Sequence, residues 1–161
     1  MRIVAAALAV ILLSVGGCAR AQSDTQNPTS FMAQNALADG VKVLPSGVQY
    51  KILKSGPATG AHPTPQDEIT VNYEGALLNG QIFDSSYKRG MPSTFQLQGL
   101  IPGWIDALQQ MRPGDEWIIW VPPSLGYGDE QKGPIPANSV LVFHLELISI
   151  GGAPPAAGGA G

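Results

Sequence analysis

Short segments in which apolar and polar residues alternate run from Val41 to Ile150, and they limit the folds open to this chain of 161 residues. Val48, Tyr50 and Ile52 alternate with polar neighbours, and the same period of two recurs from Ile69 to Glu74. Such alternation predicts β-strands that bury one face. Twenty glycines and fourteen prolines suit many turns and disfavour a helical bundle. We therefore expect roughly four to six antiparallel strands.

Asn79-Gly80 lies between two apolar pairs and predicts a tight hairpin turn between two of these strands. One segment, Gly103 to Met111, instead has the period of a helix and ends at Pro113-Gly114. Its apolar residues at i, i+3, i+4 and i+7 are Trp104, Ala107, Leu108 and Met111. The chain is 44% hydrophobic, which suffices for one compact core. Together these features predict an α+β fold in which one short helix crosses a face of an antiparallel sheet.

The N-terminus predicts an export signal. Met1-Arg2 is followed by an almost wholly apolar run, Ile3 to Val15, which is too short to span about 30 Å of hydrocarbon. Residues 1–17 therefore match a secretory signal peptide. Val15 to Cys18 also resembles the bacterial lipobox, which implies cleavage before Cys18 and lipidation of its thiol. The alternative is a plain signal peptide with a chance cysteine.

The segments around the domain have distinct compositions. Residues 18–30, from the lipidated cysteine onward, are small and polar and predict a flexible tether. Residues 31–43 predict a short helix, with Ser30 as its N-cap, and a lead-in to the domain. Residues 151–161 are glycine, alanine and proline only, which predicts a disordered tail. Ala19 stands where an aspartate would resemble an inner-membrane retention signal, so we expect an outer-membrane lipoprotein that faces the periplasm.

Composition excludes several classes of function. Charged residues make up 13% of the chain and the formal net charge is −3, so no basic footprint for nucleic acid is expected. One cysteine and two histidines do not make a metal site. Ser85 and Ser86 lack a paired base, which argues against hydrolase chemistry.

Six motifs occur in an order that is specific as a set. They are Leu44–Tyr50, Val71–Gly75, Phe83–Ser86, Ile101–Trp104, Gly126–Gly128 and Leu141–Phe143. Residues 44–150, which carry them, resemble an FKBP-type peptidyl-prolyl cis-trans isomerase. The resemblance implies an antiparallel half-barrel sheet wrapped around one short helix. The first motif, with Phe31 to Asn35 before it, is similar to the Mip-like lipoprotein branch; the long dimerisation helices of that branch are absent here, so we expect a monomer.

The resemblance assigns roles by motif and no cofactor. A proline pocket would have Trp104 as its floor and Tyr73, Phe83 and Phe143 as walls. Leu100 and Ile101 would form the rim, with the Ile101 N–H as a donor to a substrate carbonyl. The Tyr127 hydroxyl would donate to another carbonyl, Asp84 would lie at the pocket edge, and Ile135 would close one side.

Two positions depart from the family pattern. Ser93 falls where many members carry an aromatic wall, which implies a more open cleft and weaker binding of macrolide inhibitors. Pro134 replaces a usual aliphatic residue in a slightly shorter loop. By contrast, Phe95, Trp117 and Trp120 are expected to be core residues.

The resulting hypothesis is an isomerase for Xaa-Pro bonds of proline-containing polypeptides, such as unfolded or exported envelope proteins. It would stabilise the twisted amide in an aromatic pocket without a covalent step. The alternatives are a chaperone or binding module with little catalysis, and a cell-surface factor that acts on host proteins.

Overall fold

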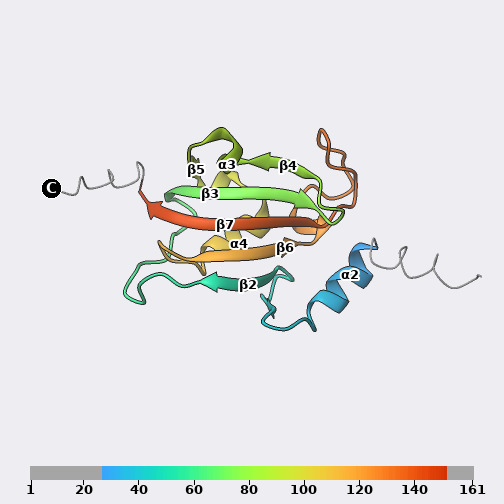
Figure 1. Ribbon diagram of the computed structural model, residues 1–161, viewed down its shortest axis with the longest axis horizontal. Coiled ribbons are helices and arrows are strands. Elements are labelled where there is room, and N and C mark those ends of the chain that lie inside the picture. The colour runs from blue at the N-terminus through green and yellow to red at the C-terminus, as the bar shows by residue number, and fades with distance from the viewer. Residues whose placement is uncertain (1–26, 152–161) are drawn as a thin grey trace, which may run out of the picture.

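A single antiparallel sheet of seven strands forms the body of the molecule, and helix α4 lies behind it (Figure 1). The computed structural model describes residues 27–151. The strands follow the order β1-β2-β6-β7-β3-β4, and β5 pairs with β3. Their bounds are β1 Lys42–Val43, β2 Gln49–Lys54, β3 Glu68–Leu77, β4 Ile82–Ser85, β5 Ser93–Gln96, β6 Glu116–Val121 and β7 Leu141–Ile150. The predicted α+β class is confirmed, with one strand more than the upper expected number.

The two longest strands, β3 and β7, pair at the centre of the sheet from Ile69↔Ile150 to Leu77↔Leu141. On β7, buried residues alternate with half-buried ones along most of the strand. The side chains that face α4 are the apolar ones, including Leu145 and Leu147, which are fully buried. This pattern matches the predicted period of two and places the core on one face of the sheet.

Asn79-Gly80 forms the predicted turn between β3 and β4. The Leu77 N–H donates to the Gln81 carbonyl at 2.9 Å, and Gly80 has a φ of +85°. Glycine adopts this backbone conformation without steric cost. The turn returns the chain so that β4 lies beside β3, which places Phe83 and Asp84 next to the end of β3.

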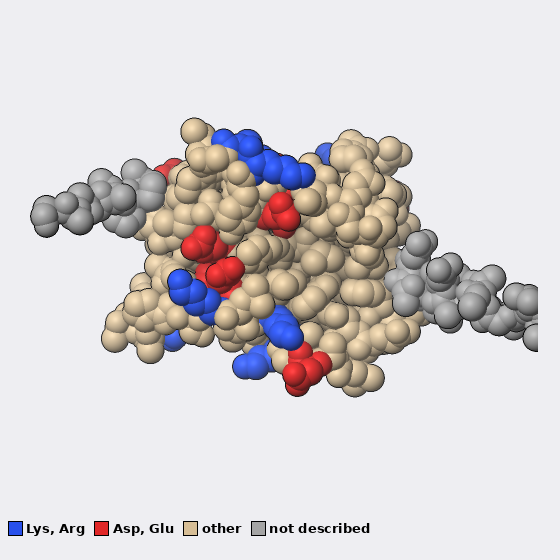
Figure 2. Space-filling model, in the orientation of Figure 1, with Lys and Arg blue, Asp and Glu red and all other residues tan. Residues whose placement is uncertain are grey.

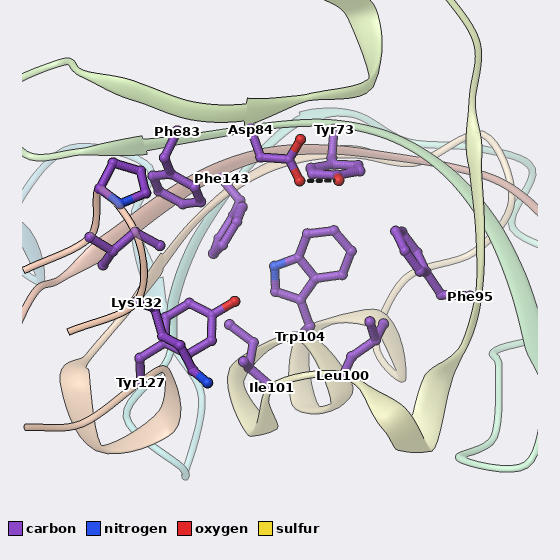
Figure 3. Close-up of a pocket in the computed structure, with 12 residues that line it drawn as sticks. Tyr73, Phe83, Asp84, Phe95, Leu100, Ile101, Trp104, Tyr127, Lys132 and Phe143 are labelled. Atoms are coloured by element: carbon purple, nitrogen blue, oxygen red, sulfur yellow. Dashed lines mark hydrogen bonds between the residues drawn. The ribbon is translucent and has the colours of Figure 1, made fainter. Parts of the chain in front are cut away.

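Helix α4, Pro102–Leu108, ends earlier than the periodicity predicts. Its last residues tighten into shorter turns, in which the Met111 N–H donates to the Leu108 carbonyl at 3.0 Å. The predicted apolar stripe is nevertheless buried throughout. A Cβ atom on Gly103 would lie 2.5 Å from Val121 Cγ1, so only glycine allows the helix to pack this closely on β6. Trp104 follows directly and points to the same side of the domain as the pocket described below (Figure 3).

The N-terminal helix α2, Pro28–Asn35, begins earlier than predicted. Asn27, not Ser30, is the N-cap, because its side chain accepts hydrogen bonds from the Thr29 and Ser30 amides at 3.0 and 3.2 Å. Proline at the first helical position also suits this start. Residues 28–30 therefore belong to the helix and not to the tether. Cys18, the signal peptide and the tail from residue 152 lie outside the described residues.

A buried amide fixes α2 to the sheet. Gln49 on β2 is 4% exposed; it accepts a hydrogen bond from Asn35 and donates one to the Met32 carbonyl, at 2.8 and 2.7 Å. The remaining helices are α3 Ser86–Arg89 and the 3₁₀ turns η1 Leu97–Gly99 and η2 Pro123–Leu125. None of the helices within residues 27–151 is long and apolar enough to cross a membrane. Figure 2 shows acidic and basic side chains interspersed on the face in view, without a continuous basic patch there.

Candidate active site

A cavity of about 360 Å³ opens between the sheet, the start of α4 and the loop before β7. Its lining consists of Tyr73, Phe83, Asp84, Phe95, Leu100, Ile101, Trp104, Tyr127, Lys132, Pro134, Ile135 and Phe143. Figure 3 shows that the side chains converge from these separate elements. Most of the lining is aromatic or aliphatic, which is typical of a site that binds a small apolar group.

Trp104 forms the floor of this cavity. Its ring meets the rings of Tyr73 and Phe143 edge-on, with centroids 5.1 Å apart in each pair. Phe95 approaches in the same manner at 6.1 Å. Edge-to-face contacts of this kind are favourable beyond the area that they bury. Three rings therefore hold the indole in one orientation, and Trp104 is only 4% exposed.

Gly75 on β3 allows two further rings to pack against the sheet. Phe83 and Phe143 meet edge-on, with centroids 5.7 Å apart. A Cβ atom on Gly75 would lie 2.6 Å from the Phe83 ring and 2.8 Å from the Phe143 ring. The absence of a side chain at Gly75 thus allows the Phe83 and Phe143 rings to pack close to β3.

The polar side of the site is a network around Asp84. The Tyr73 hydroxyl and the Arg89 guanidinium both donate short hydrogen bonds to the Asp84 carboxylate. Arg89 also donates to the Tyr73 hydroxyl at 2.9 Å, and its charged group lies 5.4 Å from the centroid of the Tyr73 ring. The Tyr73 amide in turn donates to Ser86 at 2.8 Å. These bonds fix the carboxylate at the pocket edge and occupy both of its oxygens.

The network also sets the charge state of this edge. Burial raises the pKa of Asp84, but the hydrogen bonds from Tyr73 and Arg89 and the charge of Arg89 outweigh it, so the pKa lies below its usual value. Burial and the bond to Asp84 raise the pKa of Tyr73. At neutral pH the site therefore holds a carboxylate and a protonated phenol. Neither is placed as a general base, because the carboxylate is already hydrogen-bonded on both sides.

Ile101 and Tyr127 bring unused hydrogen-bond donors to the cavity, as do the Trp104 indole N–H and the Lys132 ammonium. Neither the Ile101 N–H nor the Tyr127 hydroxyl has a partner among residues 27–151. Figure 3 shows the Tyr127 hydroxyl directed into the cavity. Ile101 is the N-cap of α4, so its backbone is fixed by the start of the helix. A polypeptide in the cavity would find donors for its carbonyls at both positions.

Nine of the ten pocket residues predicted from the sequence line this one cavity: Tyr73, Phe83, Asp84, Leu100, Ile101, Trp104, Tyr127, Ile135 and Phe143. Ser93 does not line it. Ser93 lies on β5 opposite Val71, and its hydroxyl accepts a hydrogen bond from Arg89 at 3.0 Å.

Phe95, expected in the core, faces the cavity instead, two residues along the same strand. Side chains two positions apart lie on the same face of a strand. The spacing of Ser93 and Phe95 could therefore have indicated that Phe95 faces the same side as the predicted pocket position Ser93. Pro134, noted above as a departure from the family pattern, also lines the cavity, as does Lys132. Arg89 supports it from α3, and no local sequence pattern marks Lys132 or Arg89.

Trp117 and Trp120 do not line the cavity. Trp117 is 4% exposed and stacks on Tyr50, with ring centroids 4.4 Å apart. It belongs to the core under β2 and β6, as predicted. Trp120 was also expected in the core, but this prediction is wrong. It is half-buried and pairs with Gln49 and Val142 in the sheet, because it lies on the face of β6 opposite the buried Ile119 and Val121.

Comparison with known proteins gives consistent matches. A family model described as FKBP-type peptidyl-prolyl cis-trans isomerase matches residues 59–148. A second, described as the domain amino terminal to FKBP-type peptidyl-prolyl isomerase, matches residues 18–52. The peptidyl-prolyl cis-trans isomerase Mip of Coxiella burnetii is 49% identical over 128 residues, which cover 79% of this chain and 55% of the relative. The outer membrane protein MIP of Legionella longbeachae is 44% identical over 132 residues, 81% of this chain and 56% of the relative.

Solved structures agree with this result. The crystal structure of FkpA from Escherichia coli superposes with a TM-score of 0.74 at 36% identity, covering 84% of this chain and 62% of that one. The peptidyl-prolyl cis-trans isomerase of Pseudomonas syringae pv. tomato gives 0.73 at 35% identity, covering 81% and 96%. The chain spans about half the length of the curated relatives that it matches.

Proposed function

Because this chain belongs to the FKBP-type peptidyl-prolyl cis-trans isomerase family, we propose that it accelerates rotation about Xaa-Pro bonds in polypeptides. The observation that carries the proposal is the aromatic cavity over Trp104, which has the unused donors of Ile101 and Tyr127 at its edge. The names of the relatives do not favour the alternative of a binding module without catalysis.

An apolar cavity suits this reaction because of the electronic structure of the amide. The barrier to rotation, about 18–20 kcal/mol, comes from resonance that separates charge between oxygen and nitrogen. The twisted transition state has lost this resonance and carries less separated charge. Aromatic walls therefore solvate the twisted amide better relative to the planar one than water does. Xaa-Pro bonds exchange over tens to hundreds of seconds without a catalyst, which is slow enough to limit folding.

Some residues of the cavity bind the proline ring, and others orient the polypeptide on either side of it. The proline ring packs on the Trp104 indole, between the Tyr73 and Phe143 rings. The Ile101 N–H and the Tyr127 hydroxyl donate to carbonyls on either side of the bond and hold the chain in a turn. Asp84 is fixed by Tyr73 and Arg89, so it shapes the pocket edge without exchanging a proton. The reaction needs no nucleophile.

The direct test is an exchange measurement by NMR on Xaa-Pro peptides. The purified protein is expected to raise the cis-trans exchange rate in proportion to its concentration. An aggregation assay with a proline-free client separates this activity from holding unfolded chains. An exchange rate equal to the uncatalysed background, from a protein shown to be folded, would refute the proposal.

Replacing Asp84 with asparagine should lower kcat/KM by about fivefold, because the pocket edge loses the carboxylate that holds the Tyr73 hydroxyl and the Arg89 guanidinium. The Asp84 pKa is lowered, so the pair is fully formed above the ordinary carboxyl pKa of about 4. It is lost as pH falls through the lower folded value. Wild-type kcat/KM should therefore stay level from about pH 8 to 5 as far as Asp84 is concerned. Asp106→Asn, a matched change on α4 outside the lining, should have little effect; equal rates for both variants would contradict the assignment.

We further propose that the protein is an envelope lipoprotein, anchored at the outer membrane through Cys18 and facing the periplasm. Support comes from the lipobox-like Val15–Cys18 and from a relative that is named an outer membrane protein. In this scheme residues 1–17 are removed, a tether leads to α2, and residues 44–150 form a monomeric isomerase domain.

Cys18→Ser is expected to move the protein from the membrane fraction to the soluble fraction of its host, because the serine cannot carry the thioether-linked lipid. Fractionation followed by immunoblotting measures this. Ala21→Ser, a change outside the motif, serves as the control and should stay with the membrane. If both variants fractionate like the wild type, Cys18 is not the anchor.

A further inference from the structure

Lys132 is the one lining residue that brings a positive charge to the cavity. It lies in the loop between η2 and β7, and its position is fixed by two backbone hydrogen bonds with Ile135, at 3.0 and 2.9 Å. Ile135 is only 5% exposed, so this short loop is anchored in the wall of the pocket. Figure 3 shows Lys132 beside Tyr127, across the cavity from Asp84.

The charges around the cavity do not cancel. Asp84, the other charged lining residue, is paired with Arg89, which lies outside the lining. The Lys132 ammonium has no ion pair or hydrogen bond among residues 27–151. Asp129 and Glu130 precede it in the same loop, but they are exposed and do not line the cavity. A substrate in the pocket therefore meets one uncompensated charge at the wall, and that charge is positive.

We propose that Lys132 makes this site prefer substrates that carry aspartate or glutamate next to the proline, on the side that faces Tyr127. The proposal rests on the proposed isomerase function and states which charge next to the proline that function favours. An acidic side chain next to a proline packed on Trp104 lies within reach of a lysine on the adjacent loop. Because the ammonium is exposed to water, the preference is modest, about threefold over the uncharged analogue.

The test compares peptides that differ only in charge. One series places Glu, Gln or Lys directly before the proline, and a second places them directly after it. We expect a Glu-to-Gln ratio of kcat/KM of about three in one of the two series for the wild-type protein. Lys132→Met should bring this ratio to about one, and Lys132→Glu should invert it. The ratio should fall toward one at about 1 M salt, where the Debye length is about 3 Å.

Lys42→Glu on β1 is the matched control, because it makes the same change of net charge outside the pocket lining. It should leave the ratio at the wild-type value. Equal values for Glu and Gln in both series, or a ratio that Lys132→Glu leaves unchanged, would overturn the proposal.

A binding measurement separates this proposal from the proposed function. The dissociation constants of the same peptides are followed by the NMR shift of the Trp104 indole N–H. If no peptide is isomerised but Glu peptides bind about threefold tighter than Gln peptides, the isomerase proposal fails and the charge preference stands. If isomerisation occurs and the Kd and kcat/KM values of the two peptides are equal, only the charge preference fails.

Discussion

Trp104→Ala is expected to lower the free energy of unfolding by about 3–5 kcal/mol, the usual cost of removing a buried tryptophan. It should also reduce kcat/KM by at least about tenfold, because the proline ring loses the surface on which it packs. The indole touches three rings of the site at centroid distances of 5.1 to 6.1 Å, so its removal leaves Tyr73, Phe95 and Phe143 without a common support.

Trp117→Ala separates the two effects. Trp117 is buried to the same extent as Trp104, with 4% exposure each, but it stacks on Tyr50 outside the cavity. We expect a similar loss of stability and nearly wild-type kcat/KM per folded molecule. Denaturant titration gives the stability, and the exchange assay at a temperature where both variants are folded gives the activity. Equal activity losses would show that Trp104 acts only through stability.

Gly75→Ala is the second change with a large expected effect. The added methyl group would lie within 3 Å of both the Phe83 and the Phe143 ring, and a real Cβ atom does not tolerate such contacts. The rings must move toward the cavity, which narrows the space for proline. We expect a cost of about 1–3 kcal/mol from overpacking and a loss of about tenfold or more in kcat/KM, for a shift of the walls of about 1 Å.

Gly99→Ala is the matched control, because an added Cβ atom there meets nothing within 4 Å. It should change stability by less than about 0.5 kcal/mol and leave the activity unchanged. A Gly75→Ala protein with wild-type activity would mean that the two rings relax without entering the cavity. The ring currents of Phe83 and Phe143, read from NMR shifts of their neighbours, would distinguish these cases.

The strands and helices that could be predicted are those long enough for a single segment to show its hydrophobic period. The long strands β3 and β7 show many alternations, and the apolar stripe from Trp104 to Met111 begins on α4 and continues into the turn after it. The strands β1 and β5 have two and four residues, too few for a period to appear. The start of α2 was misplaced because Asn27 and Ser30 are both good N-caps, and the proline after Asn27 decides between them.

The site could be predicted where a motif marks it and not where residues meet only through space. Nine lining residues follow from the family resemblance. Arg89 lies five positions after Asp84, and nothing in the sequence indicates that its side chain folds back over Tyr73. Phe95 and Ser93 share one face of β5, so only the pairing with β3 decides which of them reaches the cavity. Lys132 lies at the cavity because its backbone is hydrogen-bonded to that of Ile135. Backbone bonds of this kind leave no mark in the sequence.

The loop that carries Tyr127 and Lys132 has a mechanical consequence for catalysis. Strands β3 and β7 are bonded along most of their length, whereas residues 126–139 are held by a few backbone bonds, such as those from Gly128 to Pro123 and from Asn138 to Gly128. Such sparsely bonded segments open with far lower free energies than central strands. In the reaction that we propose, the rotating amide oxygen passes between a densely bonded wall, β3 and β7, and this more sparsely bonded loop, so the loop is the part of the pocket that can adjust to the twisted bond.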